Sequence, residues 1–117
     1  ILLSQNQSFA NATVTGAHSR SKELETLCVN SDIIISAIGI PKFLKSKMVS
    51  DNSIIIDVGI SRVVDETSSK GYIIVGDVDF EDFIQRDVMI TPVPGGVGPM
   101  TISMLLKNTL KACELKD

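Results

Sequence analysis

The chain has 117 residues, of which 44% are apolar and 21% charged, and it carries a formal net charge of −3. This length fits one small domain, and the composition is that of a globular protein rather than a disordered segment. The acidic balance argues against a nucleic-acid-binding protein, which needs clustered Lys and Arg. Because no apolar run approaches the ~20 residues that cross a bilayer, no membrane association is expected either.

The cysteines and the first residue bear on the origin of the chain. Two cysteines, Cys28 and Cys113, cannot form a disulfide framework, so we expect a cytoplasmic protein with reduced thiols. Both fall on predicted apolar helix faces, and we expect them to be inert core residues. The chain begins at Ile1 rather than at Met, and we therefore expect it to be a piece of a longer protein.

The first predicted elements are a strand and a helix. Residues 12–17 are short and β-branched, which favours a strand. Residues 21–29 carry apolar side chains at the i, i+3, i+4 spacing of a helix face. The hydroxyl of Ser19 or Ser21 is expected to cap this helix by accepting an otherwise unpaired backbone N–H.

Two isoleucine-rich segments follow, at residues 32–38 and 53–59, with a short helix or turn at residues 44–50 between them. Neither segment alternates polar and apolar side chains. A strand that is apolar on both faces is typical of a parallel sheet covered by helices. These segments therefore predict two strands that are buried on both faces.

The second half of the chain repeats the alternation. Residues 72–76 and 88–90 predict strands, and residues 79–86 predict a helix between them. A final helix is expected from Pro99, since proline is tolerated at the first helical position. Its apolar stripe consists of Ile102, Leu105, Leu106, Leu110 and Cys113.

Strands that alternate with helices predict an α/β fold of the Rossmann-like kind, with a mostly parallel sheet and helices on both faces. Such sheets bind ligands at the carboxyl ends of their strands. The glycine-rich turn that follows the first strand of a dinucleotide-binding fold is missing, and residues 1–9 resemble the end of the helix after it. We therefore expect residues 1–117 to be one NAD(P)-binding domain that lacks its first strand and its phosphate-binding turn.

The segment after the first predicted strand is a candidate phosphate site. Ser19 and Arg20 stand where a dinucleotide fold chooses its cofactor, and no acid is present there to bind the ribose hydroxyl of NAD. A hydroxyl and a guanidinium beside a helix N-terminus suit an anion. A solvated polar turn with a helix cap explains the same residues. No metal partner is evident for His18.

Three further segments lie at or after the ends of predicted strands. Gly39 would let a flat ring approach the backbone, although a simple turn accounts for it as well. Asp57 closes an apolar strand, and we expect its carboxylate to receive backbone or serine hydrogen bonds rather than to act in catalysis. Residues 92–99 hold three Gly and three Pro directly before a helix, a density that favours a ligand-binding loop.

No convincing acid–base constellation is present, so we assign no catalytic residue and no metal ligand. A catalytic lysine is usually desolvated in an apolar setting, which shifts its pKa. Lys42, Lys45 and Lys47 lie instead in a polar segment that we expect to be exposed.

The chain closely resembles the C-terminal cofactor-binding domain of the bifunctional methylenetetrahydrofolate dehydrogenase/methenyltetrahydrofolate cyclohydrolase family. The resemblance covers essentially the whole chain in order, and residues 90–101 carry its most specific motif. Ser61 departs from the family, which usually has Asn at that position. The matching segments are residues 12–15 with His18-Ser19-Arg20, residues 37–41, 56–60, 75–80, 90–101 and 105–110.

The resemblance implies a role for several residues. Ser19 would meet the 2′-phosphate of NADP with help from Arg20, and NAD is the less favoured cofactor. Gly39 and Ile60 would lie against the cofactor near its nicotinamide end, and Thr101 would sit close to the cofactor. The floor where folate meets nicotinamide would be formed by Pro94, Gly95 and Gly96.

The implied activity is the oxidation of 5,10-methylenetetrahydrofolate with NADP and the hydrolysis of the methenyl product to 10-formyltetrahydrofolate. The family's catalytic Tyr and Lys belong to an N-terminal domain that this chain lacks, so we expect the 117 residues alone to be inactive. A homodimer is implied for the intact enzyme. The alternatives are a dinucleotide-binding module without catalysis and a different Rossmann dehydrogenase, neither of which explains the loop at residues 92–99.

Overall fold

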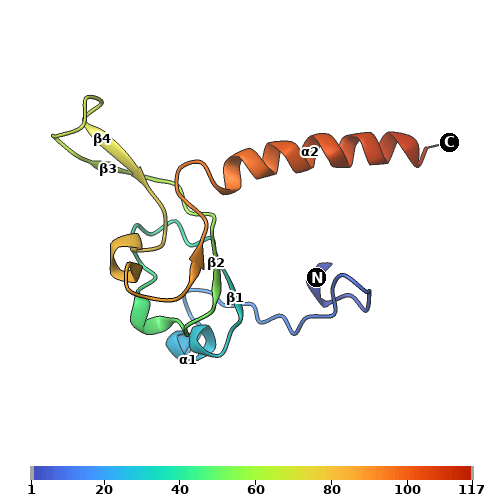
Figure 1. The fold of residues 1–117 in the computed structure, drawn as a ribbon, viewed down its shortest axis with the longest axis horizontal. Coiled ribbons are helices and arrows are strands. Elements are labelled where there is room, and N and C mark those ends of the chain that lie inside the picture. Colours follow the sequence, from blue (N-terminus) through green and yellow to red (C-terminus); the bar gives the residue numbers. More distant parts are fainter. Residues whose placement is uncertain (1, 117) are drawn as a thin grey trace.

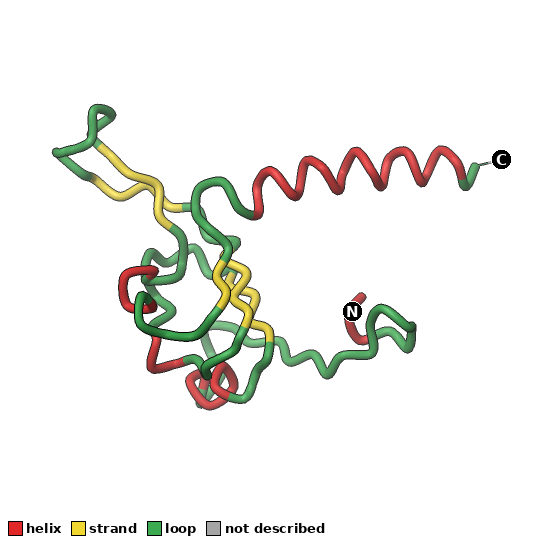
Figure 2. Tube along the Cα trace, viewed as in Figure 1, coloured by secondary structure: helices red, strands yellow, loops and turns green. Residues whose placement is uncertain are grey.

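The computed structural model describes residues 2–116 and shows a mixed α/β fold (Figure 1). Helices and strands alternate in the first half of the chain, and the longest helix lies near its C-terminus (Figure 2). In chain order the elements are η1 (Leu2–Ser4), α1 (Leu24–Val29), β1 (Ile33–Ser36), η2 (Ser46–Met48), β2 (Ile54–Asp57), β3 (Ser61–Val64), β4 (Tyr72–Val75), η3 (Phe80–Phe83), β5 (Met89–Ile90) and α2 (Val97–Glu114).

The predicted parallel sheet is confirmed. Its three strands lie in the order β1-β2-β5, and both pairs are parallel. Ile33 pairs with Ile54, and Ile54 pairs in turn with Met89. Since all three strands run in one direction, their carboxyl ends lie at one edge of the sheet, which is the edge where ligands bind in this class of fold.

A second sheet was not foreseen. Strand β3 pairs antiparallel with β4, with Ser61 opposite Val75 and Val64 opposite Tyr72. The two strands form a ribbon that projects from the parallel sheet (Figure 1). Arg62 places its guanidinium 5.0 Å from the centre of the Tyr72 ring, a cation–π contact across the ribbon. Residues 72–76 were predicted as a strand, but no strand was predicted at residues 61–64, which pair with them.

The hydrophobic core is small and lies on one side of the parallel sheet. Strand β1 buries Ile34, whereas Ile33 and Ile35 remain 55% and 57% exposed, so the expectation of a strand covered on both faces is wrong for β1. Among residues 2–116, no helix makes extensive contact with β1. The buried apolar residues are Ile34, Leu44, Met48, Val49, Ile55, Val78 and Phe83.

The N-terminal predictions need correction. Residues 12–17 form no strand, because no neighbouring segment pairs with them among the described residues. Of the helical tail expected at residues 1–9, only the 3₁₀ turn η1 is present, and residue 1 lies outside the described part. Glu23 is the N-cap residue of helix α1. It has a left-handed φ of 54° and makes no side-chain hydrogen bond that caps the helix. Neither Ser19 nor Ser21 caps it.

Three further expectations differ from the structure. Residues 79–86 contain a 3₁₀ turn, η3, rather than an α-helix. Helix α2 begins at Val97, two residues before Pro99. None of its residues is buried, so the apolar stripe of this helix, including Cys113, is exposed rather than part of the core. Cys28 is half-buried, and burial raises the pKa of its thiol.

Arg86 fastens the turn η2 to the segment after η3. Its guanidinium donates to the carbonyl oxygens of Ser46 at 2.9 Å and Val49 at 2.7 Å, and Nε donates to the Asp51 carboxylate at 2.7 Å. The planar guanidinium can serve all three acceptors at once, which a lysine ammonium cannot do in this geometry. Arg86 therefore holds together two segments that lie about forty residues apart in the sequence.

Arg86→Lys is expected to lower the free energy of unfolding by about 1–2 kcal/mol, because at least one carbonyl oxygen loses its partner. Denaturant titration of the purified chain measures this change. Lys47→Arg is the control, since Lys47 makes an exposed ion pair with Glu25 and such pairs contribute little. Equal stability of Arg86→Lys and the unsubstituted chain would show that the three hydrogen bonds of the Arg86 guanidinium do not contribute to stability.

Candidate functional site at the carboxyl edge of the sheet

The loops at the carboxyl edge are held together by two buried aspartates. Asp57 is the last residue of β2, and Asp77 follows β4 by two positions. Both side chains are almost fully buried, at 3% and 0% exposure. A buried carboxylate needs hydrogen-bond donors around it, and here the donors are mainly backbone N–H groups from the neighbouring loops.

Asp77 holds the loop after β1. Its Oδ2 accepts from the backbone N–H of Ile38 at 2.7 Å and from the Ser36 hydroxyl at 3.2 Å. The N–H of Gly39 donates to Oδ1 at 3.0 Å and is shared with Oδ2 at 3.3 Å. One side chain therefore fixes the course of the chain as it leaves the sheet at β1.

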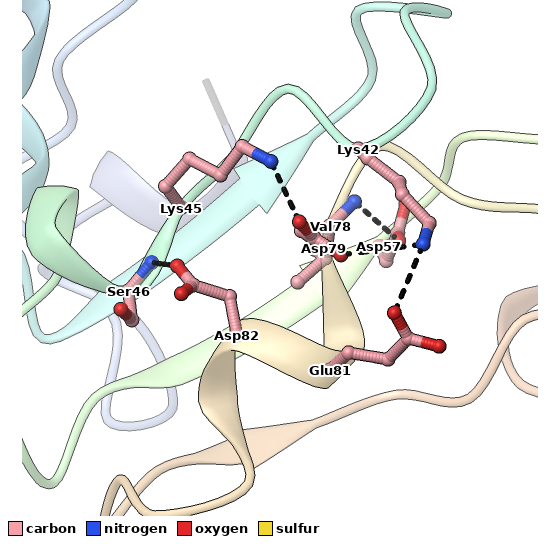
Figure 3. A network of polar contacts seen from close by, with 8 residues as sticks. All are labelled: Lys42, Lys45, Ser46, Asp57, Val78, Asp79, Glu81 and Asp82. Atoms are coloured by element: carbon pink, nitrogen blue, oxygen red, sulfur yellow. Dashed lines mark hydrogen bonds and ion pairs between the residues drawn. The ribbon is translucent and has the colours of Figure 1, made fainter.

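Asp57 holds the segment that carries Asp77. Oδ1 of Asp57 accepts from the backbone N–H of Asp77 at 3.0 Å and of Gly59 at 2.9 Å. Oδ2 accepts from the backbone N–H of Val78 at 3.0 Å (Figure 3). Its own N–H donates to Thr91 Oγ1 at 2.8 Å. The expectation that Asp57 receives backbone hydrogen bonds is confirmed. The loops after β1, β2 and β4 are thus connected through two carboxylates, and the backbone N–H of Asp57 adds the segment after β5.

Two glycines make room for these carboxylates. A Cβ on Gly59 would collide with the Asp77 side chain, and a Cβ on Gly76 would collide with the Asp57 side chain. Both glycines are buried. Any larger residue at either position would have to displace a carboxylate from its donors.

A groove of about 790 Å³ lies between the sheet edge and the first turns of α2. Gly95, Gly96 and Thr101, all predicted site residues, line it together with Ile56 of β2. Gly95 has a φ of +100°, a conformation that favours glycine, and the peptide bond before Pro94 is cis. The remaining lining residues are Thr91, Pro92, Val97, Met100, Met104, Leu105 and Asn108.

A second, smaller groove of about 390 Å³ runs between β4 and the segment at residues 91–93. Lys42 and Glu81 lie at this groove, and their ammonium and carboxylate groups are 3.3 Å apart. The hydrogen bond and the charge of Glu81, with the charge of Asp79, raise the pKa of Lys42. Figure 3 shows the contact between Lys42 and Glu81. Lys45 pairs with Asp79 at 2.6 Å. These lysines are ion-paired surface groups, as the polar setting of their segment predicts.

The same acidic segment also holds the turn η2. The backbone N–H of Ser46 donates to the Asp82 carboxylate at 2.7 Å (Figure 3). This hydrogen bond lowers the pKa of Asp82. The residues after β4 therefore hold two loops in place, one through the buried Asp77 and one through the exposed Asp82.

Gly39 and Ile60 lie outside both grooves but at the same edge. Gly39 has a φ of +74°, and a Cβ built on it would meet no atom within 4 Å. Its N–H is occupied by Asp77, while the other side of the residue is open. Ile60 is 67% exposed between β2 and β3. Open backbone at Gly39 and exposed apolar surface at Ile60 fit a flat ring that approaches the edge.

Ser19 and Arg20 lie in an exposed turn before α1 and line neither groove. The turn is closed by the N–H of Ser21 donating to the His18 carbonyl at 2.8 Å, and the N–H of Arg20 donates to His18 Nδ1 at 3.1 Å. No carboxylate among residues 2–116 forms an ion pair with the Arg20 guanidinium. The structure therefore leaves a cation and a hydroxyl exposed together in one turn, as an anion site requires.

Sequence reasoning missed Asp77, Gly59 and Gly76 as parts of the site. The available signal was an acid directly after an apolar strand, the same signal that singled out Asp57. Asp77 lies in a stretch with three acids between residues 77 and 81, which reads as a solvated surface. Only the fold reveals that the first of these acids is buried.

Two absences can be stated for residues 2–116. They contain no cluster of three or more His, Cys, Asp or Glu side chains that could hold a metal ion. Within the same range, no helix has the length and apolar character needed to cross a membrane.

A parallel α/β sheet with glycine-containing loops at its carboxyl edge is the arrangement of dinucleotide-binding domains. The chain belongs to the tetrahydrofolate dehydrogenase/cyclohydrolase family, because the sequence profile of that family's NAD(P)-binding domain matches residues 1–117. This finding confirms the resemblance drawn from the sequence motifs, and it argues against an unrelated Rossmann dehydrogenase.

Curated relatives and solved structures agree with this assignment. The bifunctional protein FolD of Flavobacterium psychrophilum is 57% identical over 114 residues, which are 97% of this chain and 39% of that protein. The FolD protein of Flavobacterium johnsoniae is 54% identical over 117 residues, or 100% of this chain and 40% of that protein. The chain thus spans about two fifths of the length of these relatives.

Two crystal structures are similar to this fold. The bifunctional FolD enzyme of Campylobacter jejuni matches with a TM-score of 0.77 and 45% identity over 93% of this chain and 36% of that one. The Trypanosoma brucei dehydrogenase-cyclohydrolase, solved with NADP cofactor and an inhibitor, matches with a TM-score of 0.75 and 45% identity, covering 86% of this chain and 34% of that one.

Proposed function

We propose that this chain is the NADP-binding half of an enzyme that oxidises 5,10-methylenetetrahydrofolate and hydrolyses the methenyl product to 10-formyltetrahydrofolate. The observation that carries the proposal is the loop at residues 92–99, which opens onto a groove at the carboxyl edge of a parallel sheet. The family assignment supports the same reading, as does the NADP bound to the Trypanosoma brucei relative.

The described residues fit a dinucleotide. Gly39 and Gly95 leave backbone open where a side chain would otherwise stand, which suits a flat nicotinamide ring. We assign Gly39, Ile60 and Thr101 to the cofactor. Thr101 places its hydroxyl near the start of α2, where it donates to the Val97 carbonyl at 2.9 Å. The turn that carries Ser19 and Arg20 is assigned to the 2′-phosphate of NADP.

The folate side of the site is assigned to Pro94, Gly95 and Gly96. Hydride transfer from the methylene carbon to the oxidised nicotinamide needs the two rings stacked closely, and a backbone floor without bulky side chains permits that. We propose that the catalytic residues come from a folate-binding domain of the kind that makes up the rest of the relatives' length. A cytoplasmic homodimer is proposed for the intact enzyme.

A chimaera tests this function. The 114 matched residues of the Flavobacterium psychrophilum relative are replaced by those of this chain, and NADPH formation is followed after addition of 5,10-methylenetetrahydrofolate. We expect NADP reduction and cyclohydrolase activity in the chimaera, and neither in the 117-residue chain alone. A folded chimaera that fails to reduce NADP, or turnover by the isolated chain, would contradict the proposal.

A further inference from the structure

We propose that Asp77 is a positioning residue of the cofactor site, which fixes the backbone of Ile38 and Gly39 in the conformation that receives the nicotinamide end of NADP. This inference rests on the proposed function and goes beyond it. Asp77 does not touch the cofactor in this proposal. The Asp77 carboxylate binds the buried side of the loop after β1, and the cofactor is proposed to approach the open side of the same loop.

The contacts of Asp77 are suited to this task. Its carboxylate is fully buried, yet it holds a backbone segment that is exposed at Gly39. Two successive N–H groups, of Ile38 and Gly39, converge on the one side chain at 2.7 Å and 3.0 Å. One side of the Gly39 residue is therefore tied to the interior, and the other side faces open space.

A carboxylate is the side chain that this arrangement requires. All the partners of Asp77 are donors, namely two backbone N–H groups and the Ser36 hydroxyl. An ionised carboxylate only accepts, so it can satisfy all of them. An asparagine has the same shape but carries one acceptor oxygen and an NH₂ group, which would face an N–H with another donor. Asp77→Asn should therefore break a hydrogen bond to the N–H of Ile38 or Gly39 without leaving a cavity.

The second aspartate extends the effect across the edge. Asp57 fixes the backbone of Asp77 and, through its own N–H, contacts Thr91, which directly precedes the loop at residues 92–99. The position of Gly39 is thereby linked to the loop that forms the proposed folate floor. A shift of the Asp77 carboxylate moves the cofactor loop first, because Asp77 contacts that loop directly and the floor only through Asp57.

The test compares Asp77→Asn with Ser53→Ala in the chimaera described above. Ser53 is equally buried, at 2% exposure, but lies at the opposite, amino end of β2, where its hydroxyl donates to the Ser31 carbonyl at 3.3 Å. The measurements are the Kd of NADP by equilibrium titration, the KM of both substrates, the Tm, and amide hydrogen exchange at Ile38 and Gly39.

We expect Asp77→Asn to raise the Kd and KM of NADP about tenfold, to leave the KM of the folate little changed, and to speed amide exchange at Ile38 and Gly39. Ser53→Ala is expected to lower the Tm without changing the Kd of NADP. An unchanged Kd in Asp77→Asn would overturn the proposal. The proposal would also be overturned if Ser53→Ala raised the Kd of NADP as much as Asp77→Asn does, with an equal loss of Tm.

Ser36→Ala is the milder companion variant. It removes one donor to the Asp77 carboxylate and leaves both N–H contacts in place. The expected rise in the Kd of NADP is about threefold, as for one weakened hydrogen bond. If Asp77→Asn does not fold, an unchanged Kd in Ser36→Ala overturns the proposal. Failure of the unsubstituted chimaera to reduce NADP is a different result, because it contradicts the proposed function itself.

Discussion

Gly76→Ala is expected to lower the free energy of unfolding by about 3 kcal/mol or more, because overpacking and lost buried hydrogen bonds act together. The new Cβ would overlap the Asp57 carboxylate, which is buried at 3% exposure. Moving Asp57 would break its hydrogen bonds to the N–H groups of Asp77 and Val78. Denaturant titration of the purified chain measures the loss.

Gly16→Ala is the matched control for this prediction. Gly16 is exposed, and a Cβ on it would meet no atom within 4 Å. Neither glycine has a positive φ, so backbone strain does not separate the two. The control should be neutral or slightly stabilising, because alanine reduces the freedom of the unfolded chain. Equal stability of the two variants would mean that Asp57 can move without cost.

Arg20→Ala in the chimaera is expected to weaken NADP far more than NAD. One contact between Arg and a phosphate contributes roughly 1.5–3 kcal/mol, as for hydrogen bonds to charged groups, and this corresponds to about a tenfold to hundredfold rise in the Kd of NADP. NAD has no 2′-phosphate, so its Kd should change little. Titration with both cofactors measures the difference.

Lys22→Ala controls for the general loss of a positive charge near the site. Lys22 is exposed two residues after Arg20, and its removal should weaken both cofactors slightly and equally, since exposed charges are screened by salt. Equal losses of NADP and NAD in Arg20→Ala would remove the reason to assign the 2′-phosphate to this turn.

The elements that could be predicted are those whose signal is local. The isoleucine runs of β1 and β2 predict strands because a continuous apolar run of that length fits a buried strand. The β-branched composition of residues 12–17 also predicted a strand, but that prediction was wrong, because no neighbour supplies a hydrogen-bonded ladder among the described residues. Sequence reasoning also missed β3, because Ser61 and Arg62 follow a glycine and resemble a loop until β4 pairs with them.

The site divides in the same way. The loop at residues 92–99 could be predicted because its Gly and Pro content is unusual by itself. The role of Asp77 could not, since its partners Ile38 and Gly39 lie 39 and 38 residues away in the sequence. Nothing in a single sequence states which acid will be buried beneath which loop. Asp57 was noticed only because it closes an apolar run.

These sequence separations have a consequence for how the protein folds. Apart from the contact between Gly59 and Asp57, the hydrogen bonds that shape the edge join positions 20 to 41 residues apart. Those between Asp77 and the loop after β1 cannot form within a single hairpin or helix. Closing such loops costs chain entropy before any contact compensates for it. The edge should therefore be assembled only when the whole β1-to-β5 segment has come together, so that cooperative folding and competence to bind a ligand arise in the same event.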